Sequence, residues 1–280
     1  MRRILIIIFI LVTFIIGCHK EKHLIPVISR VSWITVHVRT QATFQSLYQL
    51  LKENLEIPVY FFPEKYGTAS YTGIWAGDVI LEICGPYPKN PNWSNGVMVR
   101  CNTLAFRPFE TAGTSEVELQ KRLINYDGPE GSPTINLKIT ELNTVGMPVN
   151  ISDPSHALKR QQIIYDSLSA VLQNRNGGPL GFRYIEEIHI GYKSDEYLKK
   201  WKRFLEPLKS KGNLWHLPQK PNIRFMKSDS ENIKALVFKV ESLEKAMNYL
   251  RNNNMLGDVG KDMVTINKNT TKGLTIILKE

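Results

Sequence analysis

A strand, a helix and a run of short strands recur four times along this chain, and this repeat restricts the fold more than any other feature of the sequence. Each repeat starts with a strand whose apolar and polar residues alternate, and a helix with apolar residues at helical spacing follows. The expected first strands cover residues 32–39, 101–107, 185–192 and 235–240, and the expected helices cover 41–54, 115–124, 195–209 and 242–252. Four units of like form predict an α+β fold built by tandem duplication.

Alternation along each strand also predicts which side chains share a face. In the first strand, Ile34, Val36 and Val38 fall on one face, which we expect to be buried. The opposite face continues onto the neighbouring strands and forms the concave side of the first pair of units. Its expected members are Trp33, Thr35, His37, Ile80, Glu82, Cys84, Thr103 and Arg107.

Four stretches carry this rhythm with particular residues: VSWITVHV at 31–38, WAGDVILEI at 75–83, IEEIHI at 185–190 and LVFKVESLEKA at 236–246. Together they resemble the vicinal oxygen chelate superfamily, which includes glyoxalase I, extradiol dioxygenases and fosfomycin-resistance proteins. The resemblance covers residues 30–280. It implies a glyoxalase/dioxygenase-like α+β fold of tandem βαβββ modules, with mixed sheets curled into cups and helices on their outer face.

In that superfamily, metal ligands project into the cup from the first and last strands of a module. The resemblance therefore implies a divalent metal, with Fe, Mn, Ni and Zn as candidates, and Glu82, Glu187 and His189 as its ligands here. Poor donors stand at the other expected ligand positions, which are Trp33, Thr103, Ala235 and Ile277. A catalytic transition-metal site normally has three protein ligands, so the predicted site is incomplete. For Glu187 and His189, solvated or ion-paired side chains are the alternative.

His37 and Glu82 are the candidate catalytic pair of the first cup. An imidazole oriented by a carboxylate acts as a general base, and the same two side chains are also suitable metal ligands. The alternative is a buried polar cluster in which Arg107 neutralises Glu82, because an unpaired buried carboxylate is costly. Trp33, Thr35 and Arg107 are the residues that we expect to line a small-molecule pocket.

The first eighteen residues predict export from the cell. Arg2 and Arg3 precede an apolar stretch at 4–17, which is shorter than the roughly 20 residues of a spanning helix. The stretch ends at Cys18 and resembles a bacterial lipoprotein signal, in which this cysteine is lipidated after cleavage. We therefore expect residues 1–17 to be a signal peptide and 18–29 a lipid anchor and tether at a membrane of the cell envelope. The alternative is an uncleaved membrane anchor.

Removing residues 1–17 from the 280 leaves 263, enough for two domains with real cores. We expect one module pair at 30–175, with a helical insertion near 154–173, and a second pair at 176–280. The formal charge of +10 is spread along the chain, and no nucleic-acid-binding module is recognisable, so nucleic acid is not an expected partner. Cys84 and Cys101 are either a disulfide or two buried thiols.

Three functions are consistent with these patterns. The first is an envelope lipoprotein whose glyoxalase-like domain binds a small molecule without catalysis. The second is a metal-dependent lyase, isomerase or dioxygenase, in which His37 and Glu82, or Glu187 and His189, are completed by further ligands. A third is a protein-interaction module at the envelope. The sequence shows no Ser-His-Asp order, Gly-rich phosphate loop or zinc-cysteine spacing, so those enzyme classes are set aside.

Overall fold

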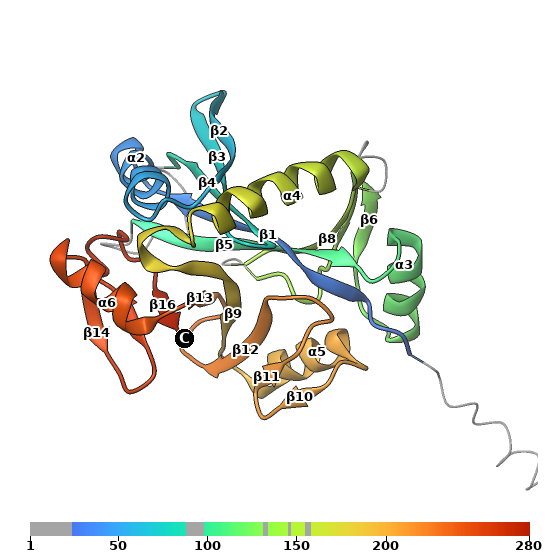
Figure 1. The fold of residues 1–280 in the computed structure, drawn as a ribbon. Helices are drawn as coiled ribbons and strands as arrows, with labels where there is room; N and C mark the ends of the chain where they lie inside the picture. Colours follow the sequence, from blue (N-terminus) through green and yellow to red (C-terminus); the bar gives the residue numbers. More distant parts are fainter. Residues whose placement is uncertain (1–23, 88–97, 131–133, 145–146, 155–157) are drawn as a thin grey trace, which may run out of the picture.

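The computed structural model describes residues 24–87, 98–130, 134–144, 147–154 and 158–280. Within these residues the strands form two eight-stranded mixed sheets (Figure 1). The first sheet has the order β2-β3-β4-β1-β5-β8-β7-β6, and the second has the order β10-β11-β12-β9-β13-β16-β15-β14. The predicted signal peptide and Cys18 lie outside the described residues.

Each sheet is built from two βαβββ modules, as the repeat predicts. The first module comprises β1 (Ile28–Val38), α2 (Gln41–Gln49) with a π-helical turn (Leu50–Asn54), β2 (Val59–Tyr66), β3 (Ala69–Trp75) and β4 (Ile80–Gly85). The second comprises β5 (Val99–Pro108), α3 (Ala112–Lys121), β6 (Asp127–Glu130), β7 (Ile135–Lys138) and β8 (Val149–Asp153). This arrangement confirms the predicted fold class.

The second sheet repeats the plan. Its first module comprises β9 (Phe182–Tyr192), α5 (Asp195–Leu205), β10 (Ser210–Lys211), β11 (Leu214–Trp215) and β12 (Asn222–Lys227). Its second comprises β13 (Ile233–Val240), α6 (Leu243–Asn252), β14 (Leu256–Val259), β15 (Val264–Ile266) and β16 (Ile276–Lys279). In both sheets the first strands of the two modules pair antiparallel at the centre, and each pairs parallel with the last strand of its own module.

A serine or threonine that follows the first strand after one or two intervening residues caps each module helix. The hydroxyls of Thr40, Thr111, Ser194 and Ser242 accept from backbone N–H groups three residues later. Thr111 explains why the helix that was expected to start at residue 115 starts at Ala112. The helix expected to reach residue 209 ends at Leu205 instead, because Pro207 disfavours helical backbone in the residue before it.

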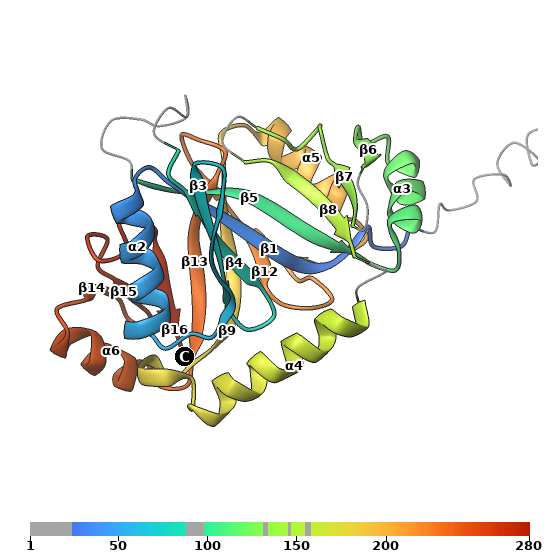
Figure 2. The ribbon, with the colours of Figure 1, turned by 90° about the horizontal axis from the view of Figure 1, so that it is seen from above.

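The apolar faces of the two sheets share one core. Ile34, Val36 and Val38 belong to it, as their alternation predicts. Helix α5 lies between the sheets, and the rings of Trp201 and Phe204 lie 6.3 and 5.7 Å from the ring of Phe106 on β5. Helices α2 and α6 lie together at one end of this layer, and α3 and α5 lie at the other (Figures 1 and 2). The two concave faces therefore point in opposite directions.

The inserted helix α4 (Leu158–Asn174) differs from the four module helices, because it lies across the concave face of the first sheet (Figure 2). Tyr165 stacks on Trp75 of β3, with 4.4 Å between ring centroids. The helix ends at a glycine-rich turn in which Gly177 has a φ of +71°. A Cβ at this position would lie 2.2 Å from the carbonyl oxygen of Phe182, so the turn requires glycine.

The two cysteines of the described region are free thiols, both buried. Cys84 lies opposite His37, and Cys101 lies opposite Val36, so the two occupy strands on either side of β1. Successive residues of β1 point to opposite faces, and the thiols therefore lie on different sides of the sheet. A disulfide between them is excluded in this fold, which settles the pairing that the sequence left open.

No helix among the described residues is long and apolar enough to cross a membrane.

Candidate functional site in the first cup

A cavity of about 290 Å³ lies between α4 and the concave face of the first sheet, and we call it the α4 cavity. Three of the residues expected at the site, Trp33, Glu82 and Arg107, line it. The remaining lining residues are Ser32, Ala105, Thr134, Ser152, Pro154, Gln161 and Tyr165. Strand alternation therefore predicted the floor of the cavity, while α4 supplies a wall that it did not predict.

Strand register determines where each floor residue lies. Trp33 of β1 is opposite Ala105 of β5, and Arg30 is opposite Arg107. On the other side of β1, Thr35 is opposite Glu82 of β4. Arg107 on β5 and Glu82 on β4 therefore enter the cavity from different strands. Their positions along the strand direction differ by about four residues, so they approach the cavity from opposite ends.

At the Glu82 end, Thr35 holds the carboxylate. Its hydroxyl donates to Glu82 Oε2 at 3.0 Å, so Thr35 supports the site from outside the cavity lining. Burial raises the pKa of the Cys84 thiol, and the adjacent Glu82 carboxylate raises it further, which makes this thiol a weak nucleophile.

His37 lies beyond Thr35 on the same strand and outside the cavity lining. Its ring packs against Tyr87 with 4.7 Å between centroids. Burial lowers the pKa of the imidazole below its usual value, which favours the neutral form at pH 7. The proposed catalytic pairing of His37 with Glu82 stays a prediction.

At the other end, Arg107 is 9% exposed. Its Nη2 donates to Gln161 Oε1 at 2.5 Å and to the Tyr165 hydroxyl at 3.4 Å. Its Nε and Nη1 groups are buried without a hydrogen-bond partner. The expected ion pair between Arg107 and Glu82 does not form, because the register places the two side chains at opposite ends of the cavity.

Arg30 adds a second positive charge at the Arg107 end. Burial lowers the pKa of Arg30, and the charge of Arg107 lowers it further. Its guanidinium lies 5.7 Å from the centroid of the Tyr165 ring. Like charges directly opposite on paired strands repel, and Asp78 offsets only part of this repulsion at Arg30.

Aromatic rings join α4 to the sheet between these ends. Besides its stacking on Trp75, Tyr165 lies 5.9 Å from the ring of Tyr60. Tyr60 in turn meets Trp33 edge to face at 6.1 Å. The middle of the α4 cavity is therefore aromatic, and its polar groups lie toward the ends.

Gln161 and Tyr165 are among the cavity residues that the sequence did not predict. They lie four residues apart on α4 and so share one face of the helix with Leu172. This spacing indicates a helix with one buried face. The spacing does not indicate which surface this buried face packs against, so it could not place Gln161 and Tyr165 in the cavity.

The second cup contains the other predicted metal ligands, Glu187 and His189, on β9. Arg224 donates to both carboxylate oxygens of Glu187, through Nε at 2.6 Å and Nη2 at 2.9 Å. His189 Nε2 lies 3.0 Å from Glu187 Oε2. Burial alone would raise the pKa of Glu187, but the hydrogen bonds from His189 and Arg224 outweigh it and hold that pKa well below its usual range.

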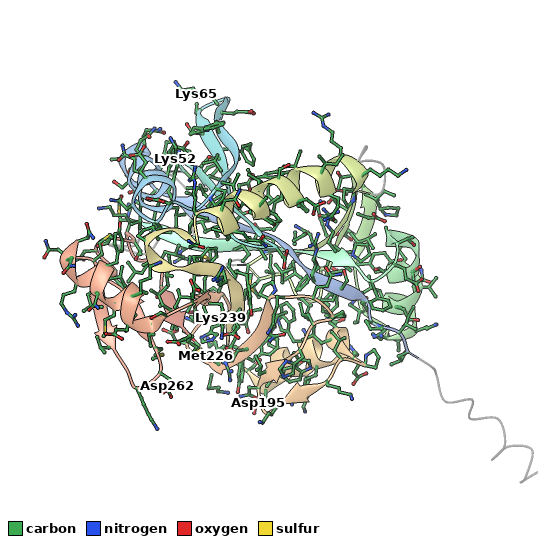
Figure 3. All side chains as sticks on the ribbon, in the orientation of Figure 1. Lys52, Lys65, Asp195, Met226, Lys239 and Asp262 are labelled. Atoms are coloured by element: carbon green, nitrogen blue, oxygen red, sulfur yellow. The ribbon has the colours of Figure 1, made fainter. Side chains whose placement is uncertain are left out.

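Figure 3 shows Lys239 of β13 and Met226 of β12 below α4, in the lower half of the molecule in this view. Met226 is exposed, and α4 covers the first cup alone. The predicted ligands Glu82 and Glu187 consequently belong to different sheets with opposed concave faces.

Comparison with solved structures identifies the architecture. A homoprotocatechuate 2,3-dioxygenase variant from B. fuscum superposes with a TM-score of 0.57 over 93% of this chain and 73% of that protein, at 10% identity. The 2,3-dioxygenase LapB from Pseudomonas sp. KL28 superposes with a TM-score of 0.59 over 91% of this chain and 92% of that protein, at 11% identity. The chain has the extradiol-dioxygenase fold. No protein-family model and no curated protein matches the sequence.

Within this fold, the side chains do not fit a catalytic metal. In the second cup, Arg224 engages both oxygens of Glu187, and its positive charge opposes a cation there. The facing residues are apolar, since Val237 lies opposite Glu187 and Ile277 lies opposite Val237. Among the described residues, no three His, Cys, Asp or Glu side chains are grouped to hold a metal ion. Three protein ligands are the usual minimum for a catalytic site.

Proposed function

We propose that this protein is an exported lipoprotein that binds a small molecule in the α4 cavity without using a metal. The extradiol-dioxygenase fold supplies a curled sheet with a concave face, and the inserted helix closes that face. The resulting cavity of about 290 Å³ is of the size that accommodates a small organic molecule. Its aromatic middle and polar ends are typical of small-molecule sites.

Arg107 is the observation that carries this proposal. A guanidinium is expensive to bury unless its N–H groups are paired, yet two of the donors of Arg107 have no partner. A ligand that accepts hydrogen bonds from those groups removes this cost. The retention of an unpaired buried charge beside a cavity supports a binding role.

Filling the cavity tests the proposal. In the full chain extracted in mild detergent, Ala105→Phe places a ring on the floor of the cavity, while Val117→Phe is a matched control on an exposed part of α3. A panel of small acids, amines and neutral aromatic compounds is screened by thermal shift. We expect at least one compound to raise the melting temperature of the wild type and of Val117→Phe, and to have no effect on Ala105→Phe. Equal shifts in all three proteins, or no shift with any compound, would overturn the proposal.

The same thermal-shift assay tests whether the protein binds a divalent metal ion. We expect Fe²⁺, Mn²⁺, Ni²⁺ and Zn²⁺ to leave the melting temperature unchanged. About one equivalent of tightly bound metal that is lost on Glu82→Ala or Glu187→Ala would instead support the metal-dependent lyase, isomerase or dioxygenase.

The envelope location is the second part of the proposal, and the sequence of residues 1–18 supports it. We propose that Cys18 is lipidated and that acyl chains hold the domain at a membrane surface. In cell fractionation, the wild-type chain is expected with the membranes. Cys18→Ser is expected to move it to the soluble fraction or to leave the signal peptide uncleaved. An unchanged, salt-resistant membrane association of a cleaved Cys18→Ser chain would contradict lipid anchoring.

A further inference from the structure

We infer that the ligand of the α4 cavity is a small amphoteric acid, with a carboxylate at one end, a protonated amine at the other and a flat apolar body between them. This inference rests on the proposed small-molecule function and names the chemical class that the site recognises. It follows from the different polar groups at the two ends of the cavity.

The Arg107 end is suited to an anion. Arg107 presents two unpaired N–H donors on a 9% exposed side chain, and the partners of its third donor group are the neutral Gln161 and Tyr165. Arg30 brings a second guanidinium to the adjacent position on β1. The Nε and Nη1 groups lie on different edges of the guanidinium, so a carboxylate accepts from one of them in a charge-assisted hydrogen bond. An incoming carboxylate therefore satisfies one orphaned donor group and offsets the repulsion between the arginines.

The Glu82 end is suited to a donor. Glu82 is half-buried in the cavity wall, and Thr35 holds one of its oxygens at 3.0 Å. Its other contact is the Cys84 thiol, a weak donor with little charge to offer. Arg107 donates to Gln161 and Tyr165 rather than to this carboxylate. An ammonium group entering from the cavity supplies the missing positive partner.

The floor between the ends selects a flat body. Trp33 and Ala105 face each other across β1 and β5, and Tyr165 covers them from α4. An apolar ring between these groups buries its faces against aromatic surface.

Three probes with one ring separate the contributions of the two ends. 4-(Aminomethyl)benzoate carries both charges, 4-methylbenzoate carries the acid alone, and 4-methylbenzylamine carries the amine alone. Titrations on the full chain, followed by calorimetry and tryptophan fluorescence, are expected to rank them in that order. Ala105→Phe is expected to abolish binding of all three.

Substitutions of Arg107 and Glu82 show which protein side chain binds which charged end of the ligand. Arg107→Met is expected to weaken both acids by roughly 10- to 150-fold, the value of a charge-assisted hydrogen bond. Glu82→Gln is expected to weaken 4-(aminomethyl)benzoate and to leave 4-methylbenzoate unchanged. If Arg107 had only a structural role, Arg107→Met would destabilise the ligand-free protein, because removing one partner of a paired buried charge is costly. We expect the melting temperature of ligand-free Arg107→Met to stay within about 4 °C of wild type or to rise.

Gln161→Glu is a second, independent variant that keeps the size of the side chain. It places a carboxylate of α4 against Arg107, where Gln161 now accepts at 2.5 Å. This internal anion is expected to stabilise the fold and to exclude acids from the site. The matched control is Gln173→Glu, whose side chain is exposed near the other end of the same helix.

The outcomes distinguish this inference from the proposed function. Failure of all three probes, preference for the amine alone, or unchanged acid binding in both Arg107→Met and Gln161→Glu would overturn the amphoteric ligand. The proposed function survives that result if another compound of the panel binds wild type and not Ala105→Phe. Both fail if no compound binds.

Discussion

At the scale of single residues, the carboxylates of the two cups differ in their hydrogen-bond and ion-pair partners. Glu187 in the second cup has a bidentate partner in Arg224, whereas Glu82 in the first cup has hydroxyl and thiol contacts. The charges of the second cup cancel within the protein, which stabilises the fold and leaves little for a ligand to bind. The charges of the first cup remain separated across a cavity, and this difference is the reason for proposing the ligand site there.

Arg224→Leu tests the stabilising role of the second ion pair. Glu187 is buried, so loss of its partner is expected to lower the free energy of unfolding by about 2–4 kcal/mol at pH 7, less than a fully buried pair because the Arg224 side chain is 34% exposed. The control is Arg183→Leu, whose pair with Glu241 is exposed on both sides and is expected to contribute at most about 1 kcal/mol. Urea unfolding gives both values.

The pH dependence of this loss has a defined sign. In wild type the pKa of Glu187 lies below its unfolded value of about 4.5, so the carboxylate contributes stability above pH 4.5 that is lost on acidification toward the folded pKa. In Arg224→Leu the hydrogen bonds and the charge of Arg224 are gone while the His189 contact remains, so burial is expected to raise the pKa of Glu187 toward the protonated form. The difference in stability between the two proteins is therefore expected to be largest near pH 7 and to shrink below pH 4.5. A constant difference down to pH 3 would show that the ion pair is not its source.

At the scale of elements, α4 converts an open concave sheet into a closed cavity. The module helices occupy the convex faces of the sheets, where they form the shared core. The concave face of the first sheet therefore remains available to the buried face of α4. Tyr165 makes the central contact, through its stacking on Trp75 at 4.4 Å and its approach to Arg107. Because α4 belongs to neither sheet, its attachment depends on a few side chains.

Tyr165→Ala is expected to release α4 from the first cup. Removing a buried aromatic side chain costs about 3–5 kcal/mol, and this loss falls mainly on the docking of the helix. Hydrogen exchange is expected to speed up along α4 and at Trp75 and to remain slow in β9 and β13. Ile163→Ala, on the exposed face of α4, is the control and is expected to change stability by less than about 0.5 kcal/mol. Unchanged exchange of α4 in Tyr165→Ala would contradict this attachment.

At the scale of the whole molecule, the two sheets share one hydrophobic core. Phe106 of β5 packs on Trp201 and Phe204 of α5, and the core continues across both sheets. Arg122 of the first half donates to the carbonyl oxygens of Ile25 and Glu206, at 2.6 and 2.8 Å. This contact ties the start of the described chain to both halves. The predicted boundary between domains near residue 175 therefore does not coincide with a break in the core.

Phe106→Ala tests whether the two sheets unfold cooperatively. The lost packing is expected to cost about 3–5 kcal/mol and to lower the stability of both sheets together, with one transition in circular dichroism and in tryptophan fluorescence. Phe109→Ala, three residues further along and 40% exposed, is the control and is expected to cost less than about 1 kcal/mol. Two separate transitions, with the second sheet unaffected, would show independent halves.

Local patterns determined the repeating part of this protein. Alternation placed Trp33, Glu82 and Arg107 on the concave side, and apolar spacing located the module helices, because both depend on a backbone period of two or 3.6 residues. The helix ends were less accurate, since Thr111 and Pro207 act through capping and steric effects that periodicity does not include.

The sequence by itself therefore determined four βαβββ modules and the residues on each face of their first strands. The tertiary structure alone decided that α4 covers the first cup, that Arg107 meets Gln161 and Tyr165 in place of Glu82, and that Arg224 reaches Glu187. These contacts join residues from 37 to 58 positions apart in the chain. Strand register and the docking of a helix establish them, and neither is encoded in the periodicity of a single segment.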